Sequence, residues 1–141
     1  MARILIVDNR PVNRGLLTSV LGGAGHQPLV AASAQEGLAI ARTQPLDLIV
    51  TEIVMPSMDG YEFAQTVRAD PQLKRTQMVF YTSAHVLAEA RRLAEACGVA
   101  HIIVKPAPAE AILQTIEQAL HSEPAPVLHL ASEAFHQEQM R

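Results

Sequence analysis

Five short apolar runs alternate with stretches whose apolar residues recur at helical spacing, and this alternation constrains the fold more than any other feature of the chain. The runs lie at residues 4–7, 29–32, 48–51, 78–81 and 102–104. A strand buried on both faces of a parallel sheet is apolar along its length, whereas an amphipathic helix carries apolar residues three and four positions apart. We therefore predict an α/β fold, a doubly wound five-stranded parallel sheet with helices on both faces.

The predicted helices have recognisable start and end signals. Ser33 and Glu36 have capping-box spacing at the start of the second helix. The first helix is expected to end at the glycines of 22–25, and the fourth at Gly98. Pro108 lies near the first turn of the fifth, where proline is favoured.

Polar residues follow the predicted strands. They are Asp8 and Asn9 after the first strand, Glu52 after the third, Thr82 and Ser83 after the fourth, and Lys105 after the fifth. In open α/β sheets, ligands bind beyond the carboxyl ends of the strands, where the strand order reverses. We expect these side chains to meet at one edge of the sheet and to form the functional site.

Composition narrows the class of protein. The 141 residues, 49% of them hydrophobic, allow one buried core but not two ordinary domains. A formal net charge of −3 argues against binding nucleic acid, which needs clustered Lys and Arg. No signal peptide or apolar stretch of ~20 residues is seen, so we expect a cytoplasmic location and no membrane contact. The single cysteine, Cys97, is expected to be buried, and the six histidines to lie at the surface, since they lack metal-site spacing.

Taken together, the motifs resemble the receiver domain of bacterial two-component response regulators over about residues 2–121. The matching features are the strand ending at Asp8, the loop 55–60 (Met-Pro-Ser-Met-Asp-Gly), the pair Ser83-Ala84 and the pair Lys105-Pro106. The resemblance implies a flavodoxin-like (βα)5 fold with strand order 2-1-3-4-5 and a cis peptide bond before Pro106. It also implies a signalling module and not an enzyme.

The resemblance also assigns the site residues. Glu52 stands where relatives have the aspartate that accepts a phosphoryl group from a histidine kinase. In relatives, an acidic pair, the acceptor and a backbone carbonyl hold Mg²⁺, which corresponds here to Asp8, Asn9, Glu52 and Val54. A hydroxyl residue and a lysine bind the phosphoryl oxygens. These correspond to Ser83, with Thr82 as an alternative, and to Lys105.

Three departures indicate a degenerate receiver, or pseudo-receiver. Asn9 replaces the second acid, so Mg²⁺ is expected to bind weakly if at all. Glu52 is one methylene longer than aspartate, and a displacement of ~1 Å can cost about 100-fold in rate. Ile102 replaces the aromatic residue that relatives rotate as a switch. Glu52 could imitate phosphoaspartate, lock an inactive state, or be a drifted residue without a signalling role.

Three functions remain open from the sequence. The leading hypothesis is a receiver domain at 1–121 that is not phosphorylated and acts through protein interaction or dimerisation. Its partner would be a histidine kinase or another signalling protein, and its dimer face the fourth helix, fifth strand and fifth helix. Residues 122–141 would begin a linker to an output domain. The alternatives are a conventional Mg²⁺-dependent phosphoacceptor and a flavodoxin-like cofactor binder, although loop 8–14 lacks the Ser/Thr/Gly-rich cradle for a flavin phosphate.

Overall fold

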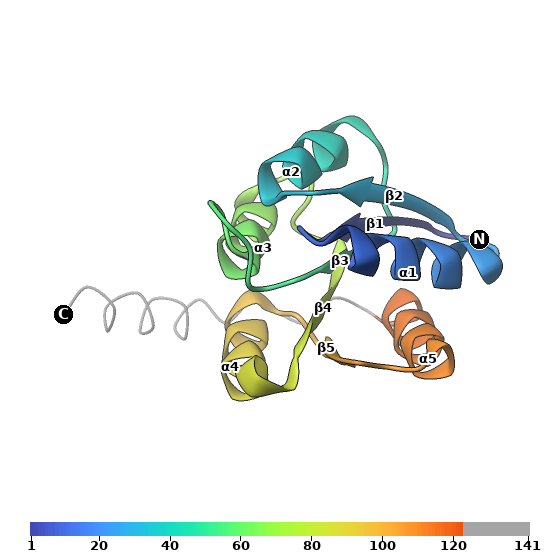
Figure 1. Cartoon of the computed structure of the whole chain (residues 1–141). Helices are drawn as coiled ribbons and strands as arrows, with labels where there is room; N and C mark the ends of the chain where they lie inside the picture. Colours follow the sequence, from blue (N-terminus) through green and yellow to red (C-terminus); the bar gives the residue numbers. More distant parts are fainter. Residues whose placement is uncertain (123–141) are drawn as a thin grey trace.

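The computed structural model describes residues 1–122, which form a parallel sheet flanked by helices (Figure 1). The strands are β1 (Arg3–Val7), β2 (Gln27–Ala31), β3 (Leu48–Thr51), β4 (Gln77–Ser83) and β5 (His101–Lys105). The helices are α1 (Pro11–Gly23), α2 (Ala34–Thr43), α3 (Gly60–Ala69), α4 (Leu87–Cys97) and α5 (Ala109–Leu120), with a short 3-10 turn, η1 (Ala84–Val86), before α4.

The strand order β2-β1-β3-β4-β5 confirms the predicted doubly wound sheet. All four strand pairs are parallel, and their registers align the carboxyl ends. Val7 pairs with Thr51 across β1 and β3, and Ser83 pairs with Lys105 across β4 and β5. The residues that follow these strands are therefore brought to the same edge of the sheet.

The core consists of two apolar clusters, one on each face of the sheet. The first packs the side chains of α2, α3 and α4 against residues such as Leu5, Ile49 and Phe80. The second packs α1 and α5 against residues that include Val79 and Tyr81. Figure 1 shows α1 and α5 on one side of the sheet. Because successive strand residues point to opposite faces, neighbouring positions of β4 belong to different clusters.

Local sequence signals account for most helix boundaries. Ser33 caps α2 by accepting a hydrogen bond from the backbone N–H of Glu36 at 3.1 Å, as predicted. Asp59 caps α3 in the same way. Gly98 ends α4 in the left-handed conformation with φ 67°, a backbone geometry that favours glycine. The first helix ends at Gly23, among the glycines that were expected to stop it, and Ala24 is its C-cap.

The bond between Lys105 and Pro106 is cis, as the resemblance implied. Cys97 is buried, as expected from composition. Within residues 1–122, none of the helices combines the length and the apolar character that a membrane crossing needs. The predicted linker at 122–141 lies, apart from Ser122, outside the described residues.

The prediction that the histidines lie at the surface is wrong for His26. Its side chain is only 7% exposed, because the turn at Gly25 directs it between the start of β1 and α5. Nδ1 accepts a hydrogen bond from the backbone N–H of Ala2 at 3.1 Å, so the proton resides on Nε2, which donates to Glu117 at 2.9 Å. A partner 91 positions along the chain leaves no local sequence signal.

Candidate functional site

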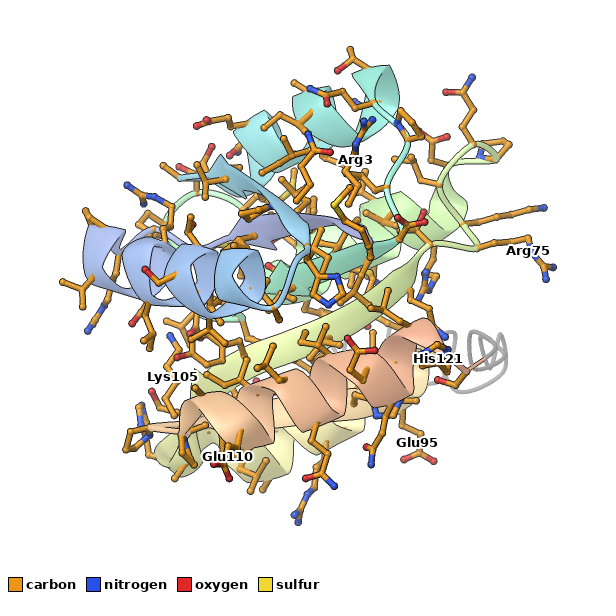
Figure 2. All side chains as sticks on the ribbon, turned by 90° about the vertical axis from the view of Figure 1, so that its right-hand side faces the viewer. Arg3, Arg75, Glu95, Lys105, Glu110 and His121 are labelled. Carbon is orange, nitrogen blue, oxygen red and sulfur yellow. The ribbon has the colours of Figure 1, made fainter. Side chains whose placement is uncertain are left out.

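The polar residues that follow the strands gather around one cavity of about 480 Å³ at the carboxyl edge of the sheet. Its lining includes the predicted residues Asp8, Asn9, Glu52, Val54, Thr82, Ser83 and Lys105. Figure 2 shows Lys105 and Glu110 near one end of α5 and His121 at the other end. The cavity therefore lies at the opposite edge of the sheet from the His26–Glu117 pair.

Glu52 has hydrogen-bond or ionic partners at both oxygens of its carboxylate. Oε1 accepts hydrogen bonds from the backbone N–H groups of Ile53 at 3.0 Å and Val54 at 3.2 Å. It also accepts one from the hydroxyl of Thr82 at 2.9 Å. Oε2 forms an ion pair with the ammonium of Lys105. The side chain thus folds back over its own backbone, and only 6% of the residue is exposed.

Asp8 is buried still more completely, at 1% exposure. Its Oδ1 accepts from the backbone N–H of Arg10 at 2.9 Å and from the side-chain amide of Asn13 at 3.4 Å. Its Oδ2 lies 3.3 Å from Nζ of Lys105. The guanidinium of Arg14 donates a hydrogen bond to the backbone carbonyl of Asp8 at 2.8 Å, which brings a further positive charge close to Asp8.

Lys105 is the centre of the charge arrangement. Its Nζ contacts both buried carboxylates, and the ring centroid of Tyr81 lies 4.7 Å away. Burying two carboxylates would be costly unless a cation compensated them. Lys105 pairs with both carboxylates, and the positive charges of Arg10, which lines the cavity, and Arg14 lie nearby, so the negative charges of Asp8 and Glu52 are compensated.

The charges of this cluster affect Tyr81. Burial raises the pKa of its phenol, and the negative charges of Asp8 and Glu52 raise it further. All three effects disfavour the phenolate, so the ring stays neutral near Lys105.

Comparison with known proteins decides the family. The model of the response regulator receiver domain matches residues 4–117. The chain belongs to this family. PilH of Pseudomonas aeruginosa is 31% identical over 120 residues, which cover 85% of this chain and 98% of PilH. The crystal structure of the chemotaxis response regulator CheY4 of Vibrio cholerae has a TM-score of 0.78 and 32% identity, covering 84% of this chain and 98% of CheY4.

Receiver domains also occur within larger proteins. The sensor histidine kinase RcsC of Escherichia coli is 34% identical over 113 residues, which cover 80% of this chain but 12% of RcsC. The chain therefore spans only a small part of that relative. Receiver domains are modules of two-component signalling, and this chain is such a module.

Glu52 lies directly after β3, at the strand end where the sequence predicted it. Asn9 and Val54 both line the cavity and are exposed, Val54 to 61%. Ile102 packs instead against the cluster beneath α4, and neither it nor Pro106 lines the cavity.

A Mg²⁺ ion fits the observed arrangement poorly. The ion needs near-octahedral oxygen ligands at about 2.0–2.1 Å, and carboxylates provide most of the charge. The oxygens of Glu52 already face three hydrogen-bond donors and an ammonium, and Lys105 would repel a second cation. In residues 1–122, no three His, Cys, Asp or Glu side chains group as a metal site. Among relatives, the receiver domain of the sensor kinase PA1611 was solved with magnesium in its active-site cleft.

The structure places the two candidate hydroxyls differently. Both line the cavity, but Thr82 is fully buried and its hydroxyl reaches Glu52, whereas Ser83 is half-buried. Sequence reasoning preferred Ser83 and missed the contribution of Asn13, Arg14 and Tyr81. The spacing of Asp8 and Arg14 does not by itself reveal that the Arg14 side chain contacts the end of β1. That contact can be inferred only when the turn between the two residues is known.

Proposed function

We propose that this chain is a pseudo-receiver, a two-component signalling module that does not accept phosphate and acts through protein interaction. The observation that carries the proposal is the occupied carboxylate of Glu52. Oε1 accepts three hydrogen bonds, and Oε2 pairs with Lys105. An acceptor carboxylate must present a free lone pair in line with the phosphorus atom, and the partners of Glu52 compete for its lone pairs.

Two further features support the absence of phosphorylation. The longer side chain displaces the carboxylate, and a shift of ~1 Å can slow a reaction about 100-fold. Phosphoryl transfer also depends on a metal ion that neutralises charge on the transferred group. With Asn9 neutral and Glu52 held by Lys105, we propose Mg²⁺ binding in the millimolar range or weaker, an order of magnitude set by the missing carboxylate.

The contacts of Glu52 favour imitation of the phosphorylated state. In relatives, a hydroxyl and the lysine bind the phosphoryl oxygens, and here Thr82 and Lys105 bind the oxygens of Glu52 instead. The carboxylate supplies one negative charge where a phosphoryl group supplies about 1.5 to 2. We infer that the domain is held in a single state, with Lys105 drawn to Glu52 whether or not a kinase is active.

A fixed module would signal through the partners that it binds. We propose that the protein acts in the cytoplasm, that it binds a histidine kinase or another signalling protein, and that it self-associates through α4, β5 and α5. Arg91 on α4 and Glu110 on α5 are exposed and of opposite charge, as a two-fold interface requires. Glu117 contacts His26 and His121 of the same chain, which leaves Glu110 as the better acidic candidate on α5.

Intact mass spectrometry tests the phosphorylation proposal. The protein is incubated with acetyl phosphate and Mg²⁺, and Glu52→Asp serves as the matched control that restores an acceptor of ordinary length. We expect no adduct on the native chain, and a gain of about 80 Da, one phosphoryl group, on the variant. A phosphate adduct on the native chain would contradict the proposal and favour a conventional receiver.

Sedimentation velocity tests the dimer proposal. Arg91→Glu should weaken association, and adding Glu110→Arg should restore it, because the exchange returns opposite charges across the two-fold axis. A native protein that stays monomeric at high concentration would exclude this interface for the isolated chain.

A further inference from the structure

Ile102 and Tyr81, two residues near the site, lie on opposite faces of the sheet. Ile102 of β5 packs against the cluster of α2, α3 and α4. Tyr81 of β4 lies in the opposite cluster, with α1 and α5, and is 2% exposed. The aromatic residue beside the acceptor site is thus on the α5 side, and the aliphatic one on the α4 side.

Consecutive residues of β4 hold the two partners of the central ion pair. Thr82 donates to Glu52 at 2.9 Å, and the ring of Tyr81 lies 4.7 Å from the ammonium of Lys105. An ammonium within about 6 Å of an aromatic ring centroid is attracted by the ring quadrupole, more strongly when both groups are shielded from water. The side chain of Lys105 is only 17% exposed, so this attraction is only partly screened.

We propose that Tyr81 positions Lys105 and couples the ion pair of Lys105 with Glu52 to the packing of α5. The proposal rests on the function inferred above, in which Lys105 is held by Glu52. Loss of charge at residue 52 would release Lys105 toward Asp8, its other carboxylate partner, and change its position over the ring.

The surroundings of Tyr81 suit such a role. In the register of β4 and β5, Tyr81 pairs with Ile103, and the same cluster contains Ile112 and Ile116 of α5, which are fully buried. A close-packed interior passes a displacement to its neighbours instead of absorbing it. The raised pKa of Tyr81, caused by burial and then by Asp8 and Glu52, agrees with a phenol close to both carboxylates.

A purely structural role for Tyr81 predicts different behaviour. If the ring only filled space, any apolar side chain of similar size would leave Lys105 in place, and loss of charge at residue 52 would affect both faces of the sheet alike. If the ring positions Lys105, phenylalanine should replace it and leucine should not, because leucine has no quadrupole. The space-filling role and the positioning role therefore predict different effects of the side chain at position 81. They also predict different responses of the two faces of the sheet.

Proton NMR of the whole chain tests the contact between Tyr81 and Lys105. In the native protein, the ε-methylene protons of Lys105 should be shifted upfield by the ring current. Tyr81→Phe should keep this shift, whereas Tyr81→Leu removes the ring current itself and so assigns the shift to this ring. Phe80→Leu is the matched control, because Phe80 is a buried aromatic residue of the same strand on the opposite face. Absence of the shift in the native protein, or its loss in Tyr81→Phe, would overturn the proposal.

Methyl chemical shifts test the coupling. Glu52→Gln should shift the methyl groups of Ile112 and Ile116 more than that of Leu93 on α4, and Tyr81→Phe should preserve this pattern. In a Tyr81→Leu background, the α5 response should be lost. A response as large on α4 as on α5 would overturn the proposal even if Tyr81→Leu failed to fold, since it is measured with Tyr81 present. These readouts need no phosphoryl donor, so they are separate from the mass test of the proposed function.

Discussion

The hydroxyl of Thr82 donates a hydrogen bond to Oε1 of Glu52 over 2.9 Å, which joins the carboxyl ends of β4 and β3 at a buried point. Thr82 of β4 thus binds one oxygen of the Glu52 carboxylate, and Lys105 of β5 binds the other. The conformation of Glu52 is therefore set by tertiary contacts as well as by the adjacent backbone N–H groups.

Replacing Thr82 with valine should destabilise the protein. Valine has nearly the same shape but removes a hydrogen bond to a charged group, which contributes about 1.5–3 kcal/mol. Ser83→Ala is the control. It should change the free energy of unfolding by less than about 0.5 kcal/mol, since no network in the core depends on that hydroxyl. Urea unfolding measures both variants, and equal losses would contradict the assignment of Thr82 as the partner of Glu52.

Lys105→Met should be more damaging than the loss of Lys74, the other lysine of the chain. It leaves the carboxylates of Asp8 and Glu52 buried without their shared cation, and removing one partner of a buried ion pair costs about 3–5 kcal/mol. Lys74, an exposed lysine, provides the control, and Lys74→Met should be close to neutral.

The double variant Glu52→Gln with Lys105→Met refines this prediction. It should be more stable than Lys105→Met alone, because only Asp8 then remains uncompensated. The two changes are in contact, so their effects should not add. Additive losses in urea unfolding would mean that Lys105 does not compensate Glu52.

Because Cys97 is buried, we predict that the protein loses stability at alkaline pH. Burial raises the pKa of its thiol from 9.0 to about 11, although the Arg68 guanidinium opposes this. The folded state therefore keeps the proton that the unfolded chain releases. The contribution of the thiol is complete below pH 9 and falls as the pH rises toward 11, by on the order of 2 kcal/mol.

The measurement compares thermal unfolding of the native protein and Cys97→Ala across this range. Tyr61 and Tyr81 also have raised pKa values, through burial first, and they act in the same direction in both proteins. The difference between the two curves isolates Cys97. A variant that loses stability between pH 9 and 11 as steeply as the native chain would show that the thiol does not contribute.

The sequence predicted much of this fold because the relevant signals are local. The apolar runs of β1, β3 and β4, the cap at Ser33 and the glycine at Gly98 each specify nearby backbone. Parallel topology then brought Glu52 and Lys105 to one edge, since their strands end in register. That much follows from periodicity and strand order.

The remaining details depend on side-chain direction and long-range contacts. Thr82 and Ser83 are adjacent hydroxyls at a strand end, so they point to opposite faces, and an apolar run does not reveal which one meets Glu52. The Glu52 side chain accepts hydrogen bonds from the N–H groups of Ile53 and Val54, and His26 pairs with Glu117. No sequence pattern indicates either contact. Both arise from the packing of elements already formed.

If the chain does not accept phosphate, as proposed, two substitutions should give it much of this chemistry. Glu52→Asp shortens the acceptor, and withdrawing the carboxylate by ~1 Å releases it from its present partners. Asn9→Asp adds a carboxylate at the cavity, where Lys105 pairs with both Asp8 and Glu52. A third carboxylate makes the cavity more negative than in the native chain and provides Mg²⁺ with the oxygen ligands that it prefers.

The single variant Glu52→Asp should react slowly with acetyl phosphate and bind Mg²⁺ weakly. The double variant should bind the ion more tightly and react faster than the product of the two single effects, because both residues act on one ion. Asn9→Asp alone isolates the effect of charge without an acceptor, so it should improve Mg²⁺ binding and gain no phosphate. Titration followed by amide chemical shifts, together with intact mass, measures both properties. A folded double variant that neither binds Mg²⁺ nor gains phosphate would mean that Glu52 does not occupy the acceptor position.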